Sequence, residues 1–391
     1  MSQDLKTRLF SVAAERLVGR EDVTVIDLRA PKEFTEDHVL GAHNAPLFDD
    51  DERAMVGTLY RRRGQEPAFE AGVRITQAKI AELVARIAST AGLAAPPMDV
   101  LEERVRALTE GGVHALETRL GAEPLDVLPE RALVLCCWRG GLRSQSVAAL
   151  FRSLGFDSAV FVEGGYKAWR AVVRESVSAW KSPPSFVLRG LTGVGKTLVL
   201  RELERQRPGW TLDLEGLAGH RSSILGMVGL EPVNQKTFDR RLFERLREGF
   251  PGLVVVEGES RKVGDIVLPE SVWSAVHGGT GIELTASVER RVEVLIDDYL
   301  AVEGNREHLA RQLPYIEQRL GEKKFDAVLT GMLADGREAE LVELLLERYY
   351  DPLYTHSERD YTYRMSIDAG DPGAAASEIA DWIETQAPSV E

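Results

Sequence analysis

The amino-acid sequence predicts a mixed α/β protein of two domains, each built on parallel strands and each extended by a helical region. Short apolar runs of strand length alternate with segments of helical periodicity in both halves of the chain. A polar segment with two prolines, Lys181-Ser182-Pro183-Pro184, separates the halves. The length of 391 residues suits two or three domains with separate cores. We therefore place one domain over residues 1–180 and a second over residues 185–391.

The first half of the chain carries three strand-like segments and a helical insertion. Apolar runs bounded by turn residues predict strands at residues 23–28, 132–136 and 159–162. Two stretches of helical spacing, residues 75–91 and 100–120, are separated by the breaker Ala94-Ala95-Pro96-Pro97. We therefore expect a helical insertion over about residues 74–130, between the first strand and the second.

The second half begins as a parallel α/β sheet and ends in helices. Apolar runs predict strands at residues 186–189, 211–214 and 253–256, with helical segments between them. From Val288 onward the spacing is almost wholly helical, and the last such segment ends at Tyr350, before Asp351-Pro352. We therefore expect a helical C-terminal region over about residues 288–350.

The composition sets limits on compartment and partners. No run of about 18 apolar residues occurs, and the first residues lack the pattern of a secretory signal, so we expect a cytoplasmic protein with no membrane segment. The formal net charge of −14 argues against a broad basic surface, so a nucleic-acid partner needs a local basic patch. The two cysteines, Cys136 and Cys137, are adjacent, which excludes a disulfide framework and a cysteine-rich zinc site.

The strand at residues 132–136 leads into a loop with the composition of a reactive-thiol site. A cysteine at a strand-to-helix turn lies near backbone N–H groups and the positive end of the helix dipole, and both favour the thiolate. We therefore expect Cys137 to be catalytic, whereas Cys136 lies in the apolar strand and packs. Glycines allow the loop to form a nest of N–H groups, and the arginines supply positive charge for an anionic donor. The expected anion-binding residues are Arg139, Gly140, Gly141, Arg143 and Ser144.

A second loop has the pattern of a phosphate-binding P-loop. Residues 190–197, Gly-Leu-Thr-Gly-Val-Gly-Lys-Thr, follow a predicted strand and open a predicted helix, which is the required context. In such a loop Lys196 reaches the terminal phosphate oxygens and the Thr197 hydroxyl can hold Mg²⁺. The motif predicts a P-loop NTPase-like fold. It does not identify the ligand, because any di- or triphosphate satisfies it. The expected phosphate-binding residues are Gly190, Gly193, Val194, Gly195, Lys196 and Thr197.

Charged residues follow the other strands of the P-loop domain. The strand at residues 253–256 ends in Glu257-Gly258-Glu259, which supplies an acidic element for a metal or its water. Residues 213–223 lie at a glycine-rich strand exit, where substrates bind in open α/β sheets. For His220 and Arg221, substrate contact and a structural ion-pair role are both open at this point. The expected substrate-binding residues are Glu215, His220, Arg221, Glu257, Glu259 and Arg261.

Roughly residues 10–175 resemble the rhodanese family. The segments that carry the resemblance are residues 25–29, residues 38–46, the cysteine loop and Glu163-Gly164-Gly165-Tyr166-Lys167-Ala168-Trp169. The resemblance implies a rhodanese-like domain whose loop cysteine carries a persulfide, a role that maps onto Cys137. The helical insertion is longer than a simple rhodanese has.

Nearly the whole chain resembles the bacterial tRNA 2-selenouridine synthase family. The segments that carry this resemblance are residues 44–47, 51–60, the Cys-Cys-x-Arg-Gly-Gly-x-Arg-Ser run, 162–167, 213–218, 259–261 and 349–354. The resemblance implies conversion of 2-thiouridine to 2-selenouridine at the wobble position of tRNA through an S-geranylated intermediate. Geranyl diphosphate and selenophosphate are the implied co-substrates. The implied partners are tRNA and an enzyme that produces selenophosphate.

The resemblance also implies a division of labour between the two loops. The P-loop would hold the diphosphate of the prenyl donor, and Lys196 would stabilise the departing pyrophosphate. Cys137 would carry or deliver selenium, with the loop arginines attracting selenophosphate. Because the net charge is negative, tRNA would rely on local clusters at residues 61–63, 240–241 and 323–324.

Two other functions fit the same motifs. The first is a rhodanese sulfurtransferase fused to an ATP-dependent small-molecule kinase. The second is a non-enzymatic sensor in which a nucleotide on the P-loop controls a redox-sensitive thiol. Neither accounts for the matching segments outside the two loops.

Overall fold

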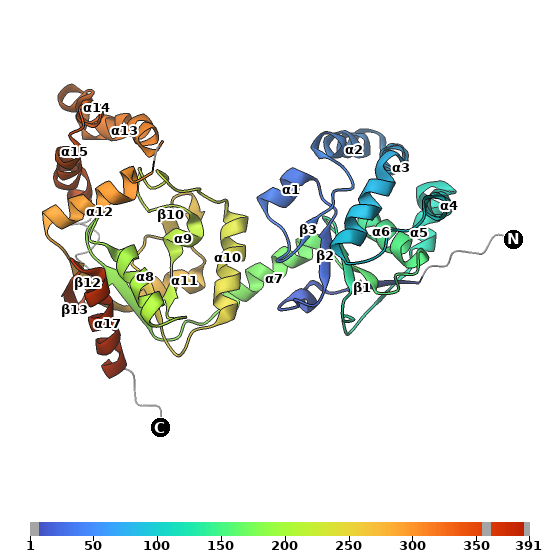
Figure 1. The fold of residues 1–391 in the computed structure, drawn as a ribbon, viewed down its shortest axis with the longest axis horizontal. Coiled ribbons are helices and arrows are strands. Elements are labelled where there is room, and N and C mark those ends of the chain that lie inside the picture. The colour runs from blue at the N-terminus through green and yellow to red at the C-terminus, as the bar shows by residue number, and fades with distance from the viewer. Residues whose placement is uncertain (1–7, 303, 354–360, 387–391) are drawn as a thin grey trace. The chain divides into compact units, whose positions relative to one another are not determined.

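The computed structural model describes residues 8–302, 304–353 and 361–386, and it separates into two compact units (Figure 1). Unit 1 is Met1–Glu175 and unit 2 is Ser176–Glu391. The division falls inside helix α7 (Gly165–Ala179), a few residues before the proline-containing segment that suggested a boundary. Each unit is built on a parallel sheet, so the predicted mixed α/β class is confirmed.

Unit 1 centres on a parallel sheet in the order β3-β2-β5-β6-β1-β4. The strands are β1 (Leu9–Val12), β2 (Thr24–Asp27), β3 (His43–Asn44), β4 (Ala122–Pro124), β5 (Leu133–Cys136) and β6 (Ala159–Val162). The predicted strands correspond to β2, β5 and β6, whose buried residues give an apolar run. Edge strand β4 is fully exposed and has no such run, which is why the sequence does not reveal it.

The helices of unit 1 are more numerous than the sequence suggests. They are η1 (Ala14–Leu17), α1 (Pro31–Glu36), α2 (Asp50–Arg63), α3 (Gln65–Thr90), α4 (Met98–Thr109), α5 (Gly112–Arg119), α6 (Leu142–Ser153) and α7. Helix α2 buries none of its residues fully, so it lacks the apolar periodicity that marks a helix. The helical insertion therefore begins near Asp50, well before residue 74. Helices α3 to α6 share one apolar core with the sheet.

Unit 2 contains a second parallel sheet, in the order β13-β12-β7-β9-β8. Its strands are β7 (Ser185–Arg189), β8 (Thr211–Leu212), β9 (Val254–Glu257), β12 (Thr280–Thr285) and β13 (Tyr363–Asp368). The strand predicted over residues 211–214 stops at Leu212, because Asp213 accepts a hydrogen bond from the Gly216 N–H and begins a helix. A small antiparallel pair, β10 (Lys262–Val263) and β11 (Ile266–Val267), lies outside this sheet.

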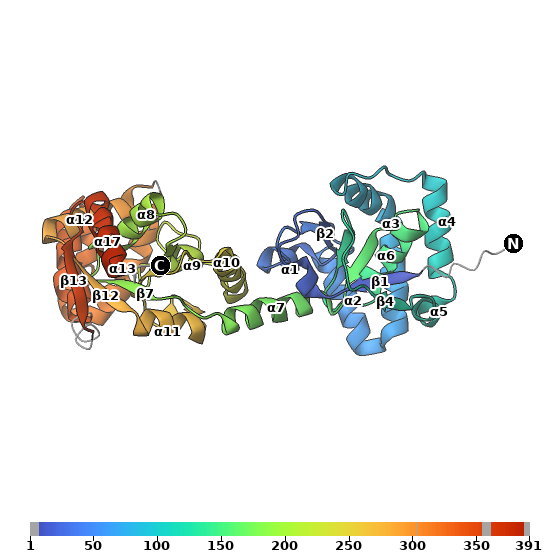
Figure 2. The same cartoon turned by 90° about the horizontal axis from the view of Figure 1, so that it is seen from below.

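Helices cover both faces of this sheet. The helices of unit 2 are α8 (Lys196–Gln206), α9 (Leu214–Ala218), α10 (Gln235–Glu248), α11 (Glu270–Gly278), α12 (Val288–Leu300), α13 (Asn305–Phe325), α14 (Val328–Ala334), α15 (Glu338–Leu345), the π-helical turn η2 (Leu346–Tyr350) and α17 (Pro372–Gln386). Helices α8 and α17 share an apolar core with the sheet, and Figure 2 shows α11 on its other side.

The helical C-terminal region has its own apolar core. Helices α12 to α15 and η2 form it, and the region spans the residues that the spacing predicts. The chain then returns to the sheet through β13 and α17, which the sequence analysis does not foresee. Within the residues described, no helix has both the length and the apolar character needed to cross a bilayer.

A buried ion pair ties the end of β2 to the rest of unit 1. Arg29 is 1% exposed, and its guanidinium donates to both carboxylate oxygens of Asp27, with the shortest contact at 2.6 Å. The guanidinium also donates to the Asp37 carbonyl and lies 3.6 Å from the centre of the Tyr166 ring. The Tyr166 hydroxyl in turn donates to the Asp37 carboxylate at 2.7 Å. This network connects the end of β2 and Asp37, eight positions after Arg29, to Tyr166 of α7, which is 129 positions from Asp37 in the sequence.

We predict that Asp27→Asn strongly destabilises unit 1. The substitution leaves the buried Arg29 cation without its counter-ion, which costs ~3–5 kcal/mol in comparable sites. Urea unfolding followed by circular dichroism measures the change in the free energy of unfolding. Asp22→Asn, which breaks the exposed ion pair with Arg20, is the control and should have little effect. An equal decrease in the free energy of unfolding of the two variants would show that the buried pair contributes no more to stability than the exposed one.

Candidate functional site

Cys137 lies between β5 and α6, at the start of the loop that the sequence singles out. Its side chain is 2% exposed, and its Sγ lies 3.2 Å from the Ser144 Oγ. Helix α6 begins at Leu142, so its first N–H groups have no partners inside the helix and lie beside this loop. A thiolate here would have the Ser144 hydroxyl and a helix N-terminus to stabilise it. Burial raises the pKa of the neighbouring Cys136 thiol well above its ordinary value, which suits a packing residue.

The turn after β6 holds the cysteine loop in place. The N–H of Tyr166 donates to the Cys137 carbonyl at 2.8 Å, and the N–H of Lys167 donates to the Trp138 carbonyl at 3.1 Å. Gly140 has a φ of +66°, and a Cβ there would lie 2.3 Å from the Val162 carbonyl oxygen. Only glycine fits this approach, so packing of the loop against the end of β6 requires glycine at position 140.

A large apolar cleft opens beside Cys137. Its volume is about 1070 Å³, and Cys137, Trp138 and Leu142 line one part of it. The other walls come from α2, α3, α5 and α6, and from the end of α4. Their apolar lining residues include Val56, Phe69, Val73, Ile80, Leu108, Leu116, Val147 and Leu150. The helical insertion therefore forms much of a cavity wall next to the thiol.

The predicted anion-binding arginines line the same cleft. Arg139 is exposed, whereas Arg143 is half-buried. The Arg143 Nη1 is buried and has no hydrogen-bond partner among the residues that the structure describes. An unsatisfied buried cation donor of this kind suits an anionic ligand. Ser144 and the Gly141 carbonyl are joined by a hydrogen bond of 3.2 Å, which orients the serine.

The P-loop adopts its expected position between β7 and α8. Gly190 has a φ of +141°, and a Cβ there would lie 2.3 Å from the Leu284 carbonyl oxygen, so glycine is required. Helix α8 begins at Lys196, and the Lys196 ammonium donates to the Gly190 carbonyl at 3.0 Å. The Thr197 hydroxyl donates to Glu215 at 3.1 Å. The loop thus presents a lysine and a helix N-terminus, the combination that binds phosphate groups.

Four acidic residues lie beside the P-loop. Glu257 is fully buried, and one of its oxygens accepts the Glu215 N–H at 2.8 Å. Its other oxygen, Oε2, has no hydrogen-bond partner in the described part of the chain. Burial, with the charges of Asp213 and Glu215, raises the pKa of Glu257 well above its ordinary value. Burial and the Glu215 charge raise the pKa of Glu259 to about 7, although Lys196 opposes the shift.

The remaining predicted substrate residues divide into three cases. His220 is 8% exposed, burial lowers its pKa, and its Nδ1 has no partner among the described residues. Arg221 donates to the Val228 and Asp298 carbonyls at 2.9 and 3.1 Å. These contacts favour the structural role that the sequence left open for Arg221. Arg261 is exposed and pairs with the exposed Glu270.

Arg291 is a site residue that the sequence analysis missed. It is 4% exposed, and its Nε donates to the carbonyl of Thr192, inside the P-loop, at 2.8 Å. Its other nitrogens donate to the carboxylate of Asp351, with the shorter contact at 2.6 Å. The Tyr-Tyr-Asp-Pro segment could have pointed to this contact, because it contains Asp351, the carboxylate that pairs with Arg291. Its continuation, Tyr354, lies outside the described residues.

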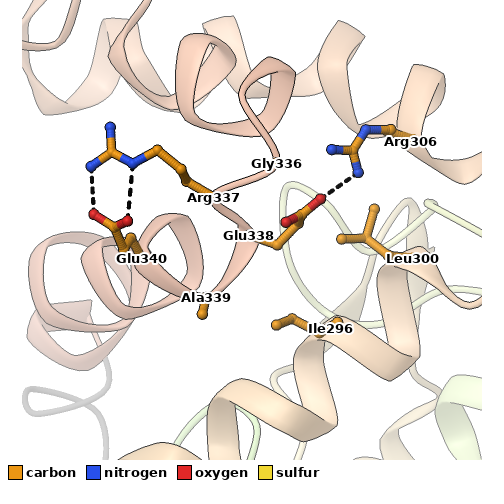
Figure 3. Close-up of a pocket in the computed structure, with 8 residues that line it drawn as sticks. All are labelled: Ile296, Leu300, Arg306, Gly336, Arg337, Glu338, Ala339 and Glu340. Carbon is orange, nitrogen blue, oxygen red and sulfur yellow. Dashed lines mark hydrogen bonds and ion pairs between the residues drawn. The ribbon is translucent and has the colours of Figure 1, made fainter.

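A separate hollow of about 560 Å³ lies in the helical C-terminal region (Figure 3). Its charged lining residues pair with one another, Arg306 with Glu338 at 2.5 Å and Arg337 with Glu340. It contains none of the residues that the motifs indicate, so we do not assign it a function.

Comparisons with known proteins gave a family model, relatives that match nearly the whole chain and a solved structure. A family model described as the tRNA 2-selenouridine synthase AAA domain matches residues 183–389. The tRNA 2-selenouridine synthase of Pseudomonas fluorescens is 31% identical over 95% of this chain and 98% of its own. That of Azotobacter vinelandii is 33% identical over 92% of this chain and 94% of its own. A solved N-terminal domain of a protein described as ATP/GTP-binding, from Clostridium difficile 630, is 28% identical over 42% of this chain and 98% of its own, with a TM-score of 0.31.

We predict that Glu259→Gln makes the protein more stable at alkaline pH. An unfolded glutamate titrates at about 4.3 and Glu259 titrates at about 7, so stability is present at low pH and falls as the pH rises through this window. The variant removes this loss and should gain ~1–3 kcal/mol in unfolding free energy at about pH 8 relative to about pH 5.

Urea unfolding of both proteins at the two pH values measures the effect. Glu270→Gln, at an exposed position in the same unit, is the control and should follow the wild type. The same pH dependence in the wild type and in Glu259→Gln would show that Glu259 does not titrate in this range.

Proposed function

The chain belongs to the tRNA 2-selenouridine synthase family, and we propose that it replaces the sulfur of 2-thiouridine at the wobble position of tRNA by selenium through an S-geranylated intermediate. It is a tRNA-modifying transferase, with a selenium donor as co-substrate. The observation that supports the two-step route is the presence, in one chain, of a thiol loop beside an apolar cleft and a P-loop. Each loop suits one of the two donors.

The first step is geranylation of the thiouridine sulfur. The sulfur forms a bond to the first carbon of the geranyl chain, the bond from that carbon to the diphosphate oxygen breaks, and pyrophosphate leaves. The nucleobase releases its N3 proton to water, because the S-alkylated ring is neutral without that proton. Lys196 and the first N–H groups of α8 would stabilise the charge that develops on the pyrophosphate.

Mg²⁺ is compatible with this loop. Among the described residues, no group of three or more His, Cys, Asp and Glu side chains could hold a metal. Mg²⁺ in phosphate sites uses one or two protein ligands and completes its shell with phosphate and water. Thr197 and Glu257 would hold it here, since the Glu257 Oε2 has no other partner among the described residues. When bound, Mg²⁺ neutralises charge on the diphosphate.

The second step exchanges sulfur for selenium. A thiocarbonyl sulfur leaves poorly, whereas the alkylated sulfur leaves as geranylthiolate when the selenium of selenophosphate forms a bond to the same ring carbon. Attack of water on phosphorus then breaks the phosphorus–selenium bond and releases phosphate, so selenium stays on the ring without a change of oxidation state. We assign this step to the rhodanese-like unit 1, where Cys137 carries or delivers selenium. Arg139 and Arg143 would attract selenophosphate. The buried Nη1 of Arg143, which has no hydrogen-bond partner within the described ranges, supports this assignment.

Binding of tRNA would depend on a local basic patch because the net charge is −14. Residues 61–63 are three exposed arginines in the last turn of α2, and Arg61 lines the cleft that contains Cys137. Arg240 pairs with Glu244, and Arg241 donates to the Leu217 carbonyl, so residues 240–241 already have structural contacts. The side chains of residues 323–324 lie outside the described part of the structure. We therefore favour residues 61–63.

We predict that Cys137→Ala blocks selenium incorporation and leaves geranylation intact, whereas Lys196→Ala slows geranylation by about 10²–10³-fold. The two substitutions act on different donors, which is the physical reason for the difference. Mass spectrometry of the wobble nucleoside, with geranyl diphosphate and selenophosphate supplied separately, measures each step. Cys136→Ala is the matched control and should retain both steps, because Cys136 is a packing residue.

Loss of both steps in a folded Cys137→Ala protein would show that Cys137 is needed for geranylation as well as for selenium incorporation, contrary to this assignment. The kinase alternative predicts steady ATP turnover and no mass gain in thiolated tRNA. The sensor alternative predicts no tRNA product under any condition, with partner capture that depends on Cys137.

A further inference from the structure

We propose that the apolar cleft of unit 1 binds the geranyl chain of the S-geranylated nucleoside while sulfur is exchanged for selenium. This inference rests on the proposed function and adds a binding site to it. It gives the helical insertion a role in the second step. The occupant is the prenyl chain already attached to the nucleobase sulfur, and not the free prenyl donor.

The size and walls of the cleft suit an aliphatic chain. Its volume of about 1070 Å³ lies at the upper end of the range for ligand pockets, which is about 300–1,000 Å³. Val56, Phe69 and Leu116 line it from the insertion, and Val147 and Leu150 line it from α6. Apolar walls of this kind favour methylene groups, and burial of two such groups corresponds to about a tenfold gain in affinity.

The position of the thiol sets the orientation of the ligand. Cys137 and Trp138 line the cleft together with the apolar residues, so a chain inside it has one end near the sulfur atom. A prenyl thioether has a single polar end, its nucleobase. With the chain in the cleft, that nucleobase lies at the end where Cys137 would deliver selenium.

Charge around the cleft is complementary to the other reactants. Arg139 and Arg143 line it beside the thiol, and the buried Arg143 Nη1 has no partner among the described residues. Arg61 lines it on the side of α2, next to exposed Arg62 and Arg63. An anionic selenium donor and a polyanionic tRNA could therefore both approach a cleft whose walls are otherwise mainly apolar.

The test uses the full-length protein, selenophosphate and tRNA that already carries either S-geranyl- or S-methyl-2-thiouridine. Thr76→Trp adds a large side chain at a half-buried position that lines the cleft. Ala78→Trp is the matched control, because two residues along α3 place it on the opposite, exposed side of the helix. The rate of 2-selenouridine formation is measured by mass spectrometry, and geranylation from geranyl diphosphate is measured separately.

We expect the wild type to convert S-geranyl tRNA with a kcat/KM at least about tenfold above that for S-methyl tRNA. Thr76→Trp should remove this preference, leaving the S-methyl reaction and geranylation unchanged, and Ala78→Trp should behave as the wild type. Gln77→Trp, at an exposed lining position, repeats the test if Thr76→Trp does not fold.

Equal use of the two tRNAs by the wild type would overturn the cleft assignment and leave the proposed function standing. A Thr76→Trp defect in geranylation, or an equal defect with both tRNAs, would also overturn it. Failure of the wild type to convert S-geranyl tRNA at all would instead reject the two-step function, and the cleft assignment with it.

Discussion

The buried ion pair between Arg29 and Asp27 is the interaction on which the architecture of the thiol site depends. A cation in this position is tolerated only because a carboxylate, a carbonyl and an aromatic ring surround it. The ring belongs to Tyr166, whose N–H holds the Cys137 carbonyl at 2.8 Å. Tyr166 therefore contacts both the ion pair and the cysteine loop.

The chain uses one structural device twice. In each unit a buried parallel strand ends in a glycine-containing loop that opens a helix, β5 to α6 in unit 1 and β7 to α8 in unit 2. The surroundings make the two loops chemically different. The thiol loop has arginines and an apolar cleft beside it, whereas the P-loop has a lysine facing buried carboxylates. In the function that we propose, this contrast assigns the selenium donor to the thiol loop and a prenyl diphosphate to the P-loop.

Parts of the fold could be predicted and parts could not, for identifiable reasons. Central strands such as β5 and β9 are buried on all residues, so they appear as apolar runs. Helix α2 and strand β4 bury none of their residues fully and leave no such signal. Both loops stand out because their glycines and charged residues are contiguous. The contact of Arg291 with the P-loop could not be predicted from the sequence, because its partners Thr192 and Asp351 lie about 100 and 60 positions away in the chain.

The sequence by itself determined the family resemblance, the mixed α/β class, and the two loops, because each depends on residues that are neighbours in the chain. Only the tertiary structure decided that the helical insertion builds an apolar cleft beside Cys137, that Arg143 has a buried nitrogen without a partner among the described residues, and that Glu257 and Glu259 share one buried environment. Cavities, desolvation and shifted pKa values arise from groups brought together across the fold, and periodicity carries no record of them.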